Sequence, residues 1–147
     1  MKLIKDISFY VCIAIIISLI AEVLSFKFLF NYLRQNVIGV LLAMLTINIT
    51  MLVLIASKIH DTLIQYPKLN FSNTKKEMKI SLLEQAILIL LSIICQLILD
   101  NSKISYEDKD FAVNTILITV LIYAVSILWD TGRAVFIFND ELKKIKS

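Results

Sequence analysis

The sequence VIGVLLAMLTINITMLVLIAS, residues 37–57, decides the fold of this chain. It contains 21 residues and none of them is charged. At a rise of about 1.5 Å per residue, a helix of this length crosses a hydrocarbon core of about 30 Å. Backbone amide and carbonyl groups inside lipid must find partners within the protein, which favours a helix over an open strand. The stretch therefore predicts a transmembrane α-helix.

The rest of the chain has the same apolar character. Hydrophobic residues make up 59% of its 147 residues, and the mean hydropathy is +0.82. Soluble domains average about 45–50% apolar residues. Further apolar runs occupy residues 7–25, 81–99 and 111–131, and only two glycines and one proline are present to form turns. We predict an all-α polytopic membrane protein, a single domain over residues 1–147 with four transmembrane helices.

The connections between the apolar runs differ in character. Residues 26–36 combine aromatic side chains with Lys27, which is typical of a segment at the headgroup level. Residues 58–80 hold five lysines and are predicted to form a basic cytoplasmic loop. The first part of this loop is able to continue the second helix until Pro67, because the residue before a proline is pushed out of the helical region.

Two further expectations concern the ends of the third and fourth helices. Ser72, Asn73 and Thr74 are candidate caps at the start of the third helix, because their side-chain oxygens can accept hydrogen bonds from free amides. The fourth helix is expected to run past the membrane boundary into a short charged cytoplasmic tail, residues 134–147.

The positive charges indicate the orientation. With four spans, the two termini and the central loop share one side. That side carries eleven cations and the other side four, which are Lys27, Arg34, Lys103 and Lys109. Short cytoplasmic loops are enriched in lysine and arginine. Both termini are therefore predicted to be cytoplasmic, in a bacterial inner membrane.

Small and polar residues mark two faces of the helix at residues 37–57. Gly39, Ala43, Thr46 and Thr50 form a stripe that lets another backbone approach closely. Asn48 points about 200° away from Thr46. An amide in lipid is costly, so Asn48 is expected to bond across helices. Two interpretations stay open, namely packing between helices and a polar ring in a homo-oligomeric pore.

Charged residues gather at the cytoplasmic ends of the helices. Asp130 and Arg133 are spaced to pair on one helix face, and Glu84 lies at a similar depth. Two interpretations of these groups stay open: they sit at the headgroup boundary, or they form a gate or docking surface for a cytoplasmic protein. The lysines of the loop are equally suited to bind the headgroups of anionic lipids. The candidate residues of this surface are Lys58, Lys75, Lys76, Lys79, Glu84, Asp130 and Arg133.

Glu22 is the charged residue within the first apolar run. It either reaches the outer interface or, if buried, carries protons. The chain has one histidine and no pattern of spaced metal ligands, and no nucleophile with a neighbouring base is visible. We therefore expect no enzyme activity, no cofactor, no metal and no direct contact with nucleic acid.

Two resemblances bear on function. The segment LIAEVLSFKF, residues 19–28, is similar to the first helix of small multidrug-resistance antiporters, which implies a proton-coupled transporter that uses Glu22. Over the whole chain, the four spans, the basic loop and the charged tail look like small membrane subunits of bacterial antiphage systems, such as the Kiwa subunit KwaA and RexB-type proteins. That resemblance implies an oligomer that senses membrane disturbance or passes ions and contacts a cytoplasmic partner.

The leading hypothesis is accordingly a homo-oligomeric inner-membrane sensor or channel-like component of an antiphage system, in contact with membrane lipid and a cytoplasmic protein. The alternative is the small multidrug-type transporter.

Overall fold

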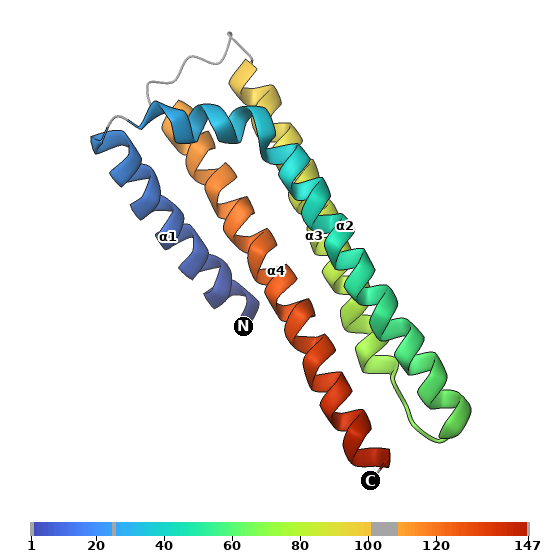
Figure 1. Ribbon diagram of the computed structural model, residues 1–147. Coiled ribbons are helices and arrows are strands. Elements are labelled where there is room, and N and C mark those ends of the chain that lie inside the picture. The colour runs from blue at the N-terminus through green and yellow to red at the C-terminus, as the bar shows by residue number, and fades with distance from the viewer. Residues whose placement is uncertain (1, 25, 101–108, 147) are drawn as a thin grey trace.

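The computed structural model describes residues 2–24, 26–100 and 109–146, and this part of the chain is entirely helical apart from short connections. Four helices follow one another in the order α1 (Lys2–Val23), α2 (Lys27–Gln65), α3 (Ser72–Asp100) and α4 (Lys109–Lys146) (Figure 1). The prediction of an all-α chain of four helices is confirmed. The helices are longer than the predicted spans, because they continue into segments that carry charge.

Helix α4 is the centre of the fold and packs against all three other helices. Its side chains Leu117, Val120 and Ala124 are at most 2% exposed and form the main core with α2 and α3. Helix α1 lies on the other side of α4, antiparallel to it (Figure 1). The result is a three-helix bundle with α1 attached along the upper part of α4.

The first turns of α2 cross one end of the bundle before the helix runs down beside α3 (Figure 1). In this crossing arm Leu33 is buried with Ala14 of α1 and Ile118 of α4. Further along, Val37 and Leu41 belong to the core shared with α3 and α4. The segment predicted as an interfacial connection is therefore part of α2, because its apolar residues cover the end of the α1–α4 pair.

Helix α2 ends where the sequence predicts. Gln65 is its last helical residue, and the Tyr66 amide still donates to the Thr62 carbonyl at 2.8 Å. The predicted caps of α3 are wrong. The side chain that accepts from the first amide of α3 belongs to Asn70, whose Oδ1 lies 2.9 Å from the Ser72 nitrogen.

The segment predicted as a basic loop, residues 58–80, is mostly helical. Only residues 66–71 connect α2 to α3. The reason is a separate apolar core in which Ile55 and Ile59 of α2 meet Met78 of α3 and Phe138 of α4. We call this lower part of the bundle the stem. The tail from residue 134 to residue 146 is likewise a continuation of α4.

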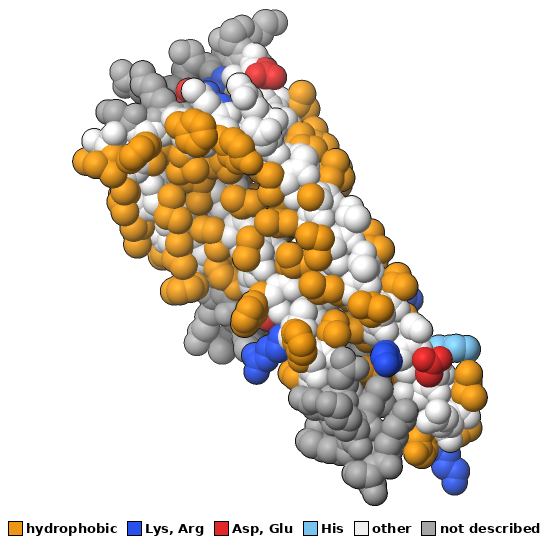
Figure 2. Space-filling view, in the orientation of Figure 1, with side chains coloured by type: hydrophobic (Ala, Val, Ile, Leu, Met, Phe, Trp, Pro, Cys, Tyr) orange, Lys and Arg blue, Asp and Glu red, His pale blue; other side chains and the backbone are white. Residues whose placement is uncertain are grey.

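Three helices are long and apolar enough to cross a membrane, over Phe28–Gln65, Ser72–Asp100 and Lys109–Phe138. The described apolar part of α1, Ile7–Val23, is shorter. Large apolar side chains face outward along the bundle, with Phe28 at 76% and Trp129 at 73% exposure. On the face in Figure 2 they form a broad band, and charged side chains lie towards its two ends. An outer surface of this kind suits lipid.

Candidate functional site

A buried amide joins three helices in the lower half of the bundle. Asn48 of α2 is 0% exposed, and its Nδ2 donates to Ser81 Oγ and to Gln85 Oε1 of α3, both at 3.0 Å. Ser81 Oγ lies 3.3 Å from Thr131 Oγ1 of α4. The expected interhelical bond of Asn48 is thus made within the chain, between α2 and α3.

Two atoms of this network have no partner among the described residues. They are Asn48 Oδ1, an acceptor, and Gln85 Nε2, a donor. Each buried polar atom without a hydrogen bond lowers the free energy of unfolding, and the two amides form fewer hydrogen bonds than they are able to form. A reciprocal pairing of the two amides would satisfy both atoms. The two amides are therefore joined by one hydrogen bond and not by a reciprocal pair.

The stripe of small residues lies on the opposite, outward face of α2. Its four members are exposed, and Thr46 and Thr50 donate to carbonyls of their own helix at 2.9 Å. A Cβ at Gly39 would meet nothing within 4 Å. In the part of the chain that the structure describes, no other helix packs closely against this stripe. Asn48 and the stripe face different surroundings, as their spacing predicts.

The candidate cytoplasmic residues do not form the expected ion pairs. Lys58, Lys75, Lys76 and Lys79 are exposed, as are Asp130 and Arg133, and Glu84 is half-buried. Among the described side chains, the only ion pair joins Arg34 and Asp110. Arg133 therefore pairs with neither Asp130 nor Glu84. Such a pair would gain little, because both Arg133 and Asp130 are exposed.

The structure places Glu22 on the outside of α1, next to the buried Ala21. It lies one turn beyond Ser18, whose hydroxyl accepts from Thr115 near the start of α4 at 2.9 Å. Glu22 is thus at the end of the bundle where α4 begins, far from the Asn48 network. No described contact favours a role for it in proton transfer.

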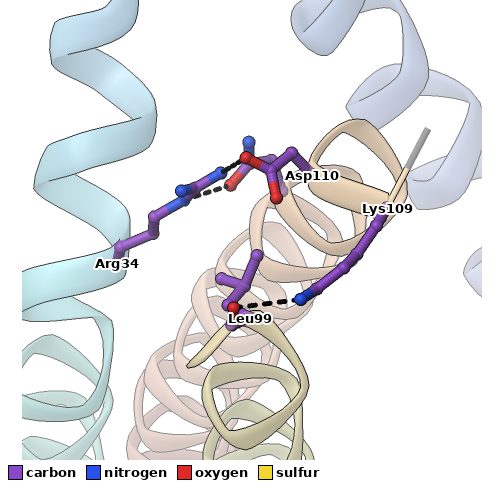
Figure 3. Close-up of polar contacts among 5 residues, drawn as sticks. Arg34, Leu99, Lys109 and Asp110 are labelled. Carbon is purple, nitrogen blue, oxygen red and sulfur yellow. Dashed lines mark hydrogen bonds and ion pairs between the residues drawn. The ribbon is translucent and has the colours of Figure 1, made fainter. Parts of the chain in front are cut away.

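A second group of polar contacts between helices, at the end of the bundle where α4 begins, was not predicted from the sequence. Arg34 of α2 donates from Nε to Asn114 Oδ1 at 3.1 Å and pairs with Asp110 at 3.0 Å (Figure 3). The backbone carbonyl of Arg34 accepts from Gln96 of α3 at 2.9 Å. We call this group the outer clamp. In the sequence this group is marked by two isolated polar residues. Gln96 lies near the end of the third apolar run, and Asn114 lies near the start of the fourth.

Lys109 forms a further contact between helices at the same end of the bundle. Its Nζ donates to the carbonyl of Leu99, so the start of α4 is bonded to the last turn of α3 (Figure 3). The distance is 3.1 Å. Because a carbonyl in the last turn of a helix has no intrahelical partner, a lysine there satisfies it. The ends of α2, α3 and α4 are thus tied together by three side chains from different helices.

The fold and these contacts define an all-helical protein in which three helices are long and apolar enough to span a membrane and polar groups join the helices at two levels. Comparisons with protein families, with curated proteins and with solved structures give no match. Within the described residues no group of three or more histidine, cysteine, aspartate and glutamate side chains is placed to hold a metal ion.

Proposed function

We propose that this chain is a four-span protein of the bacterial inner membrane, with both termini in the cytoplasm. It acts as an oligomeric sensor or channel-like component of an antiphage defence system and passes membrane perturbation to a cytoplasmic protein. One observation carries the proposal: α2 and α4 each continue without a break from the outer clamp to the stem.

The length of α2 supports transmission across the membrane. From Val37, which belongs to the core shared with α3 and α4, to Gln65 the helix rises about 42 Å, whereas the hydrocarbon core is about 30 Å thick. About 12 Å of α2 therefore projects beyond the core as the stem. A tilt or shift of α2 at the outer clamp is carried to the stem, because a helix is rigid over this distance. The crossing arm, with Phe28 and Tyr32 exposed, lies where it meets the outer headgroups.

The fourth span is assigned to α1. Its 22 residues rise about 33 Å, enough to cross the core. The Tyr10 hydroxyl of α1 lies 2.6 Å from Ser126 Oγ of α4, and the Thr115 hydroxyl of α4 donates to Ser18 Oγ of α1. Helix α1 therefore runs beside the part of α4 that is assigned to the membrane. With α1 inserted, eleven of the fifteen cations lie on the side of the termini, which makes that side cytoplasmic.

Two surfaces remain for assembly. The exposed stripe of Gly39, Ala43, Thr46 and Thr50 offers a small-residue face to α2 of another subunit, and its threonine hydroxyls are already bonded within their own helix. At the other end, Lys75 and Lys76 present positive charge at the inner boundary. We assign the stripe to the homo-oligomer and the lysines to an acidic surface of the cytoplasmic partner and to anionic lipid.

Neutralising the lysines tests the proposal. In cells that carry the gene with its neighbouring genes, the double variant Lys75→Gln, Lys76→Gln is expected to reduce phage protection at least tenfold in plaque counts, because partner attraction across this surface is electrostatic. Lys27→Gln with Lys103→Gln removes two charges from the other side and serves as the control. Protection that survives both the lysine substitutions and Asn48→Leu contradicts the proposal.

A further inference from the structure

A groove of about 600 Å³ opens beside the Asn48 network, between α1, α3 and α4, with Leu52 and Ile55 of α2 at its base. Helix α1 packs on α4 and touches the start of α2, and its described part does not pack against α3. The groove is therefore open to the side between α1 and α3. Its volume is in the range of small-molecule sites, about 300–1,000 Å³.

Three carboxylates line the groove, Glu77 and Glu84 from α3 and Asp130 from α4, and none of the lysine, arginine and histidine side chains that the structure describes lines it. None of the three has a hydrogen bond or ion pair with any side chain that the structure describes. This charge is opposite to the net charge of the chain, which is +3. The groove is thus an acidic site inside a basic protein.

The remaining lining is aromatic, hydroxylic and apolar. Tyr10 and Tyr123 pack with ring centroids 5.7 Å apart, and the Tyr10 hydroxyl lies 2.6 Å from Ser126 Oγ. Met78 and Ile127 add apolar surface from α3 and α4. Carboxylates accept all three N–H bonds of an ammonium group, and tyrosine faces attract a cation within about 6 Å. Leu52, Ile55 and Ile127 suit an apolar body.

We propose that this groove binds the ammonium group of an amphiphilic amine, with its apolar body against α2 and α4. The amine is either the headgroup of an aminophospholipid that enters between α1 and α3 or a soluble alkylamine. The site goes beyond the signalling role proposed above and takes from it only the placement of the groove near the inner boundary. Phage protection plays no part in its test.

The test is a titration of the full chain in phosphatidylglycerol nanodiscs with radiolabelled decylammonium, with empty nanodiscs as background. Decanoate has a tail of the same length and the opposite charge, and it is expected to bind at least tenfold more weakly. Glu84→Gln and Asp130→Asn are each expected to weaken decylammonium binding about tenfold, because each removes a charged acceptor. Glu22→Gln removes one carboxylate far from the groove and is expected to stay within twofold of the unmodified chain.

A second arm distinguishes the source of the amine. If phosphatidylethanolamine in the nanodisc lowers the apparent affinity for decylammonium, the lipid headgroup occupies the groove; if the affinity is unchanged, the ligand is a soluble amine. Circular dichroism and elution volume establish that each variant is folded. Equal decylammonium affinities for the unmodified chain, Glu84→Gln and Asp130→Asn overturn the proposal, and so does equal binding of decanoate.

Discussion

Replacement of Asn48 by leucine is expected to lower the free energy of unfolding by about 1–3 kcal/mol. The substitution removes both bonds of Nδ2 and leaves the oxygen of Gln85, which is 3% exposed, without its partner. Leucine has the same branched shape as asparagine and is larger, so no cavity is left and the cost comes from the lost bonds. Unfolding in mixed micelles of increasing denaturing detergent, followed by circular dichroism, measures the change.

The double variant Asn48→Leu, Gln85→Leu sharpens this prediction. It removes both buried amides at once, and replacing both partners of a bond by apolar groups is nearly neutral. The double variant is therefore expected to be more stable than Asn48→Leu alone. Ile47→Val, an exposed change on the same helix and outside the small-residue stripe, is the control and is expected to stay within about 0.5 kcal/mol. A double variant that is less stable than the single one would refute this account of the network.

Replacement of Arg34 by glutamine is expected to cost about 1–3 kcal/mol, because Asn114 is 3% exposed and its oxygen loses the bond from Nε. The Arg34–Asp110 pair adds little, since the Asp110 side chain is 66% exposed and such pairs contribute about 0–1 kcal/mol. The same detergent titration measures the change. The larger share of the cost thus comes from the buried amide.

Asp110→Asn separates the two contributions of Arg34. It removes the exposed ion pair and leaves the bond from Arg34 to Asn114 in place. Its expected cost is below about 1 kcal/mol, and smaller than that of Arg34→Gln. If Asp110→Asn destabilises the chain as much as Arg34→Gln does, the outer clamp depends on the ion pair and the assignment to Asn114 is wrong.

The sequence was sufficient for the number and order of the helices and for the end of α2, because long apolar runs and Pro67 leave few alternatives. It was insufficient for the stem. Residues 58–65 contain charged side chains, yet Ile55, Ile59 and Leu63 recur at helical spacing and pack in the stem core. The position of Pro67 predicts that α2 continues to this point, and the structure agrees. Charge counting treated residues 72–80 as part of a loop, whereas they are the first turns of α3.

The polar contacts, too, were predictable from the sequence only in part. The spacing of Asn48 and the small-residue stripe predicts that they lie on different faces, and the structure places them so. The partners of Asn48 were not predictable, because they depend on the axial register of α2 against α3. That register is fixed at both ends of the bundle, by the outer clamp and by the stem core. Contacts between helices far apart in the sequence cannot be derived from the periodicity of either helix.

The central claim is that α1 crosses the membrane, which puts both termini and the α2–α3 connection in the cytoplasm. A membrane-impermeant maleimide applied to spheroplasts tests it, in a Cys12→Ser, Cys95→Ala background with single cysteines in place of Lys2, Asn31 and Lys68. The account predicts that Asn31→Cys is labelled on intact spheroplasts, and that Lys2→Cys and Lys68→Cys are labelled only after lysis. Labelling of both Lys2→Cys and Asn31→Cys on intact spheroplasts would show that α1 does not cross and would contradict the account.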